Sequence, residues 1–172
     1  MPSEFRDDLK IISTPIDWLG LNYYTRSLIK NYKSNDGINY ECLRGDLKKT
    51  DMEWEFYPQG LGYFIERIHH KYNKKIPIYI TENGMANKDF LNEKNEIIDE
   101  DRIEYLDLHL KEVLKCLNKG IPIKGYFAWS LMDNYEWSFG YEKRFGIVYV
   151  DYQSFKRIPK KSYYEFQKYL CV

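Results

Sequence analysis

The sequence has few cysteines, no excess of charge of either sign and no long hydrophobic run. Its three cysteines, Cys42, Cys116 and Cys171, are odd in number and far apart, which is typical of reduced thiols in a cytosol. The 26 basic and 26 acidic side chains cancel, so the charge gives no indication of a nucleic-acid or membrane-surface partner. No apolar stretch could span a bilayer or serve as a signal peptide, and we expect a cytoplasmic protein with no membrane partner.

The sequence also lacks the spacing of a metal site. His69, His70 and His109 do not combine with the cysteines at the separations that zinc ligands need. We therefore predict that the protein uses neither a metal nor a cofactor.

Aromatic residues are abundant, and 17 of them are tyrosines. Aromatic rings and phenolic hydroxyls suit carbohydrate ligands, because a sugar offers C–H faces and a rim of hydroxyls. Packing in a core is the alternative for most of these side chains.

The hydrophobic pattern predicts alternating strands and helices. Short apolar runs typical of buried strands occupy residues 16–25, 76–80 and 123–130, and helical periodicity occupies residues 3–12, 60–72, 101–120 and 160–170. Asp101 and Glu104 form a capping-box pattern at the start of the third helix. Residues 26–50 form a long polar connection with a turn at 35–37, and residues 146–157 resemble a small hairpin.

This order predicts an α/β fold with a parallel sheet built from right-handed βαβ units. The chain is long enough for about three such units, whereas a closed barrel has about eight. We expect the open edges of so small a parallel sheet to seek partners.

Glu82 stands at the predicted carboxyl end of the second strand, followed by Asn83 and Gly84. Parallel sheets and barrels place their reactive groups at this edge of the strands. The alternative is that Glu82 is a solvated loop carboxylate.

Four ordered motifs resemble family 1 glycoside hydrolases, the β-glucosidase family. They are Thr-Glu-Asn-Gly at 81–84, Phe-Ala-Trp-Ser through Tyr-Glu-Trp at 127–137, Leu-Gly-Leu-Asn-Tyr-Tyr at 19–24, and the segment 141–151. The resemblance implies that the whole chain, residues 1–172, is a single partial domain. It would be the C-terminal part, strands 6–8, of a TIM (β/α)8 barrel.

The resemblance also implies roles for individual residues. Glu82 matches the catalytic nucleophile of a retaining glycosidase, and Tyr24 matches the tyrosine that holds and orients it. The substrate-binding positions of the family match Asn22, Trp54, Trp129, Glu136, Trp137 and Phe145. Core packing is the alternative for Trp129, a solvated charge for Glu136, and a cover over the next helix for Trp54.

Two of these residues indicate the type of sugar. A carboxylate at Glu136 would repel a 6-phosphate, and Phe145 has no hydroxyl to donate to one. We therefore expect a neutral β-glucoside or related sugar, rather than the phosphorylated substrate of a 6-phospho-β-glucosidase.

The acid/base motif of the family, Asn-Glu-Pro, occurs nowhere in this sequence. Two hypotheses follow. The chain is a β-glucosidase-type hydrolase by descent, with little activity alone, or it is a non-catalytic remnant that binds sugar weakly or oligomerises. In both cases we expect a truncated gene product, a homo-oligomer, or a chain complemented by the missing barrel strands.

Overall fold

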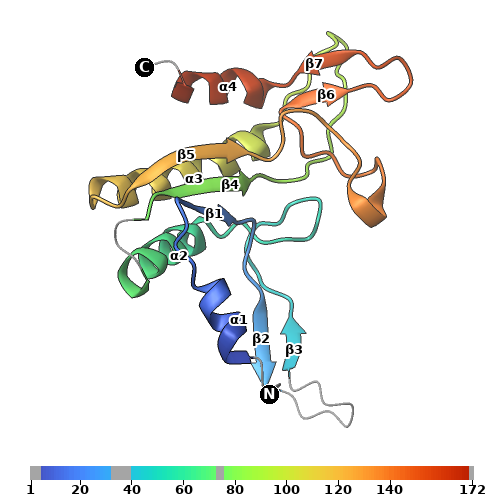
Figure 1. Cartoon of the computed structure of the whole chain (residues 1–172). Helices are drawn as coiled ribbons and strands as arrows, with labels where there is room; N and C mark the ends of the chain where they lie inside the picture. The colour runs from blue at the N-terminus through green and yellow to red at the C-terminus, as the bar shows by residue number, and fades with distance from the viewer. Residues whose placement is uncertain (1–4, 32–39, 73–75, 171–172) are drawn as a thin grey trace.

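The computed structural model describes residues 5–31, 40–72 and 76–170, with an α/β arrangement around a three-stranded parallel sheet. The strands β1 (Leu19–Asn22), β4 (Ile78–Asn83) and β5 (Ile123–Ala128) lie in the order β1-β4-β5 (Figure 1). Leu21 of β1 pairs with Ile80, and Ile80 pairs in turn with Tyr126 of β5. The three strands are those that the sequence pattern predicts, although β1 is shorter than the run at 16–25.

Two helices, α2 (Pro58–Lys71) and α3 (Glu100–Asn118), pack against one face of this sheet (Figure 1). Leu61 and Ile65 of α2 and Val113 of α3 form a core with Ile78 and Ile80 of the central strand. Apolar side chains at helical spacing thus meet apolar side chains at alternate strand positions, as the hydrophobic pattern predicts.

The other face of the sheet is open in the part of the chain that the structure describes. Trp18, Tyr79, Thr81 and Phe127 line a shallow hollow on it, and the first and last of these side chains are largely exposed. Neither β1 nor β5 has a second strand neighbour among the described residues. Apolar side chains are therefore exposed on this face, and β1 and β5 are open edges within the described residues.

The remaining elements flank the sheet at its two ends. A helix α1 (Phe5–Ile12) and an antiparallel pair of β2 (Leu28–Asn31) and β3 (Tyr40–Leu43) extend away from it (Figure 1). The short 3-10 helix η1 (Trp137–Phe139), the hairpin of β6 (Val148–Val150) with β7 (Arg157–Pro159), and α4 (Lys161–Leu170) follow β5. The predicted turn at 35–37 lies outside the described residues.

One local prediction is wrong. Helix α3 begins at Glu100 with Asp99 as its N-cap, so Asp101 lies inside the first turn. The Asp99 carboxylate makes no capping bond and accepts hydrogen bonds from the Ser162 backbone and hydroxyl. Asp101 pairs with Lys48. Tertiary partners have replaced the local capping box.

Candidate active site

The predicted catalytic pair lies where β1 and β4 end. The Tyr24 hydroxyl donates a hydrogen bond to Glu82 Oε2 at 2.7 Å, and both residues are partly buried. Burial raises the pKa of the Tyr24 hydroxyl well above its usual range, and the bond to Glu82 and the charge of Glu136 raise it further. Tyr24 therefore remains a protonated donor to the carboxylate across the physiological pH range.

A break in strand register determines which way Glu82 faces. Strict alternation would place Glu82 on the helix-covered face with Ile78 and Ile80, and Asn83 on the open face with Thr81. The pairing of β4 with β5 shifts between Ile80 and Asn83. As a result Asn83 is fully buried on the helix side, whereas Glu82 lines a hollow at the strand ends.

This hollow has a volume of about 480 Å³. It is lined by Tyr24, Met52, Trp54, Glu82, Trp129, Glu136, Trp137, Ser138, Phe139 and Phe145. The structure thus brings together all the predicted site residues except Asn22. Asn22 is exposed, and its Oδ1 accepts a hydrogen bond from the Thr81 hydroxyl at 2.6 Å.

Sequence reasoning missed Met52, Ser138 and Phe139. The signal for Ser138 and Phe139 is their position directly after Trp137, in the one-turn helix η1 that forms the rim. Met52 carries no such signal, because it reaches the hollow from the long connection before α2.

Two carboxylates and several aromatic rings dominate the chemistry of the hollow. Burial raises the pKa of the Glu136 carboxyl, and the nearby charge of Glu82 raises it further. None of the described side chains that line the hollow is cationic. The arrangement suits a neutral, hydroxyl-rich ligand, since carboxylates accept hydrogen bonds from hydroxyls and rings pack on apolar sugar faces.

The aromatic wall is preorganised by ring contacts. The ring centroid of Trp54 lies 5.5 Å from that of Tyr24 and 6.1 Å from that of Phe145. Phe145 is almost fully buried, so it supports the wall from behind, whereas Trp137 is 80 % exposed. Trp137 is therefore available to a ligand.

Close backbone approach explains Gly84 in the Thr-Glu-Asn-Gly motif. The peptide bond between Trp129 and Ser130 is cis, and a Cβ atom at Gly84 would overlap the carbonyl of Trp129. Any side chain at position 84 would push apart the ends of β4 and β5, which carry Glu82 and Trp129.

A buried ion network fixes the loops around the hollow. Arg102 of α3 pairs with Asp89 at 2.7 Å, and Lys160 pairs with Asp89 at 2.6 Å and with Asp133 at 2.7 Å. Arg144 pairs with Asp133 at 2.6 Å. Burial alone would raise the pKa of the Asp89 carboxyl, but Arg102 and Lys160 hold it below its usual range. The loop from Asp133 to Arg144, which carries Glu136, is thereby tied at both ends.

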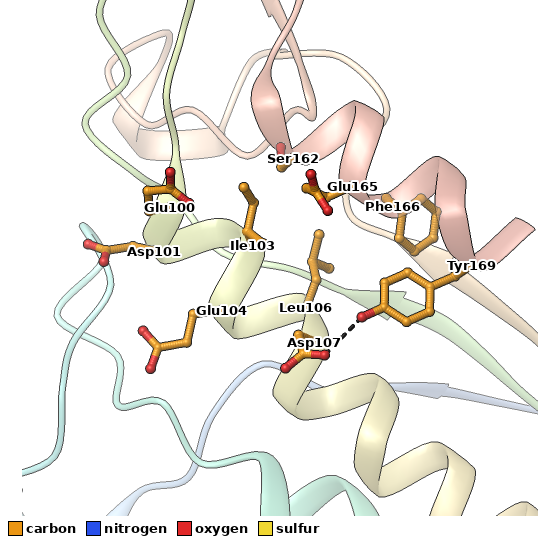
Figure 2. A pocket seen from close by; sticks show the side chains of 10 residues that line it. All are labelled: Glu100, Asp101, Ile103, Glu104, Leu106, Asp107, Ser162, Glu165, Phe166 and Tyr169. Carbon is orange, nitrogen blue, oxygen red and sulfur yellow. Dashed lines mark hydrogen bonds between the residues drawn. The ribbon is translucent and has the colours of Figure 1, made fainter.

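A second hollow of similar volume lies between α3 and α4 (Figure 2). Its floor includes Leu106 and Phe166, and the Tyr169 hydroxyl donates to Asp107 at 2.8 Å. Asp101 and Glu104 point away from α4 in Figure 2 and both pair with Lys48, whereas Glu100 pairs with Lys161 of α4. These carboxylates are structural, so the hollow at the strand ends is the candidate active site.

The hollow thus combines a carboxylate bonded to a tyrosine, a second carboxylate and indole rings at the ends of parallel strands. The chain belongs to glycosyl hydrolase family 1, whose sequence model matches residues 1–170.

Curated relatives are similar over nearly the whole chain. Beta-glucosidase A of Thermotoga maritima is 43% identical over 164 residues, which are 95% of this chain and 36% of the relative. The 6-phospho-beta-galactosidase of Clostridium acetobutylicum is 39% identical over 93% of this chain and 37% of that protein. The chain spans a little more than a third of the length of these relatives.

Solved structures show the same backbone. The beta-glucosidase from Thermotoga maritima in complex with castanospermine has a TM-score of 0.92 and 42% identity, covering 99% of this chain and 38% of that chain. The complex of that enzyme with deoxynojirimycin gives a TM-score of 0.91. The chain therefore has the fold of part of a family 1 TIM barrel.

The remaining sequence predictions concern the membrane and metals. Across the described ranges, no helix is both long and apolar enough to cross a membrane. Within the same residues, no group of histidine, cysteine and carboxylate side chains is arranged to hold a metal ion.

Proposed function

We propose that this chain is the C-terminal part, strands 6–8, of a β-glucosidase-type retaining hydrolase, forming one partial domain over residues 1–172. Glu82 is its nucleophile. The observation that carries the proposal is the 2.7 Å hydrogen bond from the Tyr24 hydroxyl to Glu82 Oε2 inside a hollow that also holds Glu136.

In this proposal a Glu82 oxygen attacks the anomeric carbon of the sugar, and the bond to the leaving group breaks with its electron pair departing on the leaving-group oxygen. Water then hydrolyses the glycosyl–enzyme with overall retention. Tyr24 orients the carboxylate through its 2.7 Å hydrogen bond to Glu82 Oε2.

The other residues bind the sugar. Trp129 stacks beneath the ring, Glu136 accepts hydrogen bonds from two adjacent hydroxyls, and the indole N–H of Trp137 donates to a third. Trp54 faces the leaving group and Phe145 supports the wall. Asn22 lies outside the hollow, and its Oδ1 accepts a hydrogen bond from Thr81, so Asn22 contacts the sugar less directly than the residues that line the hollow.

A neutral sugar is favoured over a phosphorylated one. Lys143 lies near the ring of Phe139, but its Nζ donates to Asp51 Oδ2 at 3.0 Å and to the Asp51 carbonyl at 2.7 Å. The two carboxylates of the hollow would repel a phosphate. The similarity to 6-phospho-beta-galactosidases supports the phosphorylated alternative.

None of the residues of this sequence is assigned as the general acid. Glu136 is assigned to the sugar, and the sequence holds no Asn-Glu-Pro motif. The open face of the sheet, and the edges of β1 and β5 that have no further strand neighbour among the described residues, are where the other barrel strands would pack. We propose that further barrel strands, which these residues do not supply, cover them and carry the general acid. The alternative is a non-catalytic remnant that binds sugar.

The test is the intact mass of the full chain after incubation with a 2-fluoro-β-glucoside that carries an activated leaving group. Such a substrate needs no general acid, and the fluorine slows breakdown of the adduct. We expect one sugar adduct on the peptide that contains Glu82, no adduct in Glu82→Gln, and an adduct in Glu136→Gln at higher reagent concentration. An unmodified wild-type mass would favour the remnant.

Tyr24→Phe provides a graded test of the same proposal. We expect labelling to be slower by about tenfold or more, because a hydrogen bond to a charged group contributes about 1.5–3 kcal/mol. Tyr152→Phe, which removes a hydroxyl bonded to the Asn134 carbonyl, is the matched control and should label at the wild-type rate. Equal rates for Tyr24→Phe and wild type would remove Tyr24 from the mechanism.

A further inference from the structure

A hydrogen-bonded layer lies directly beneath the catalytic pair. Its central residue is Tyr105 of α3, which is fully buried. The Tyr105 hydroxyl donates to the Tyr24 carbonyl at 2.7 Å and accepts from Asn83 Nδ2 at 3.2 Å. One phenol on a covering helix thus contacts both chain segments that carry the proposed pair.

Asn83 joins the ends of all three strands. Its Nδ2 also donates to the Tyr23 carbonyl at 2.7 Å, and its Oδ1 accepts from the Tyr126 hydroxyl at 2.5 Å. Its own carbonyl accepts from the Trp129 backbone N–H at 2.9 Å. The side chain next to Glu82 is therefore held from β1, β5 and α3 at once.

The Tyr105 ring has little freedom to move. The ring of His109 stacks on it with centroids 3.9 Å apart, and Phe56 packs edge-on with centroids 5.3 Å apart. His109 Nδ1 lies 2.7 Å from the Tyr105 carbonyl. Interlocked rings of this kind keep the hydroxyl at a fixed place.

Tyr24 needs such support, because β1 ends at Asn22 and its ladder does not include Tyr24. The Tyr23 N–H donates to the Glu82 carbonyl at 2.9 Å, and the Tyr105 hydroxyl then fixes the next peptide group. With the Tyr24 backbone held in this place, its side-chain hydroxyl lies within hydrogen-bonding reach of Glu82.

We propose that Tyr105 and Asn83 are positioning residues that hold Tyr24 in hydrogen-bonding reach of Glu82. The inference deepens the proposed function, and rests on it for the role of Glu82 as nucleophile. Tyr105 does not touch the hollow and acts through Tyr24, whose aim decides how well Glu82 is oriented.

The experiment is an NMR titration of the full chain with carbon-13 at the tyrosine Cζ atoms. The Tyr24 signal is assigned with Tyr24→Phe. Its chemical shift should change when Glu82 takes up a proton, and we call this change the Tyr24 step. Glu82→Gln should abolish the Tyr24 step. In Tyr105→Phe we expect the step to lose about half its amplitude or more, because hydrogen bonds weaken steeply with lost alignment. The control is Tyr169→Phe. It removes a phenol of α4 that is bonded to Asp107 of α3, and it should leave the amplitude unchanged.

Tyr126→Phe provides an independent variant if Tyr105→Phe does not fold. It removes the hydrogen bond to Asn83 Oδ1 and should also reduce the step. A full-amplitude step in whichever of these variants is folded would overturn the inference.

Labelling with the 2-fluoro-β-glucoside separates the two proposals. We expect Tyr105→Phe to label about tenfold more slowly than wild type, since small misplacements of a catalytic group are costly. A wild-type chain that shows the Tyr24 step but takes no label would refute the proposed function and leave the positioning role standing. If Tyr105→Phe labels at the wild-type rate, Tyr105 has no positioning role that affects the reaction of Glu82, and the inference fails.

Discussion

The two faces of the parallel sheet differ sharply in what covers them. On one face Ile78 and Ile80 are at most 1% exposed beneath α2 and α3. On the other, Trp18 is 51% exposed and Phe127 is 57% exposed. Both faces are built from the same strands, so the difference arises from the neighbours of the sheet rather than from its own composition.

The two faces therefore contribute differently to the stability of the chain. The covered face supplies the apolar burial that stabilises the chain, and it also carries Tyr105 and Asn83 beneath the proposed catalytic pair. The open face supplies no comparable burial, although its side chains are those that a closed barrel would enclose. Stability should therefore be sensitive to changes on the first face and insensitive to changes on the second.

The largest effect is expected for Ile80→Ala on the covered face. Ile80 is fully buried between the strands and helices of the main core. Removing its side chain leaves a cavity, and we expect the free energy of unfolding to fall by about 4 kcal/mol. Urea denaturation of wild type and variant measures this loss. A loss under about 1 kcal/mol would mean that the core repacks, and the proposed contrast between the faces would fail.

A smaller effect on the same side is expected from His109. Burial lowers its pKa to about 4, against an opposing contribution from the Tyr105 carbonyl. Between about pH 6.5 and pH 4 the unfolded chain binds a proton that the folded chain does not. Stability should therefore fall as the pH decreases through this range, by about 3 kcal/mol for this group.

His109→Gln measures that contribution directly. Its free energy of unfolding should be less dependent on pH than that of wild type between pH 7 and pH 4, as followed by urea denaturation at several pH values. The exposed His70→Gln is the control and should keep the wild-type slope. Parallel curves for His109→Gln and wild type would show that folding does not lower the pKa of His109, and would contradict this prediction.

The sequence alone predicted the covered face well. Apolar residues at Leu61, Ile65, Ile78 and Ile80 follow the periods of helix and strand, and this periodicity was enough to predict α2 and β4, which the structure then packs together. Local rules failed at Asp101, where tertiary bonds to the neighbouring Asp99 decided the helix start. Periodicity describes burial along one element, and it contains no information about side chains that arrive from α4.

The site was predictable for a different reason. Glu82, Trp129 and Glu136 were found through ordered motifs, and the structure brings them into one hollow. Alternation along β4 would have sent Glu82 to the wrong face, because the register shift near Ile80 is set by pairing with β5. Asn83 and Tyr105 escaped notice because their hydrogen bonds join residues 22 or more positions apart.

The smallest effect is expected for Phe127→Ala on the open face. With more than half of this side chain exposed, its removal should change the free energy of unfolding by less than about 0.5 kcal/mol. Ile80→Ala, one strand away, is the matched comparison. A loss from Phe127→Ala as large as that from Ile80→Ala would show that another chain covers the open face in solution, with Phe127 buried beneath it.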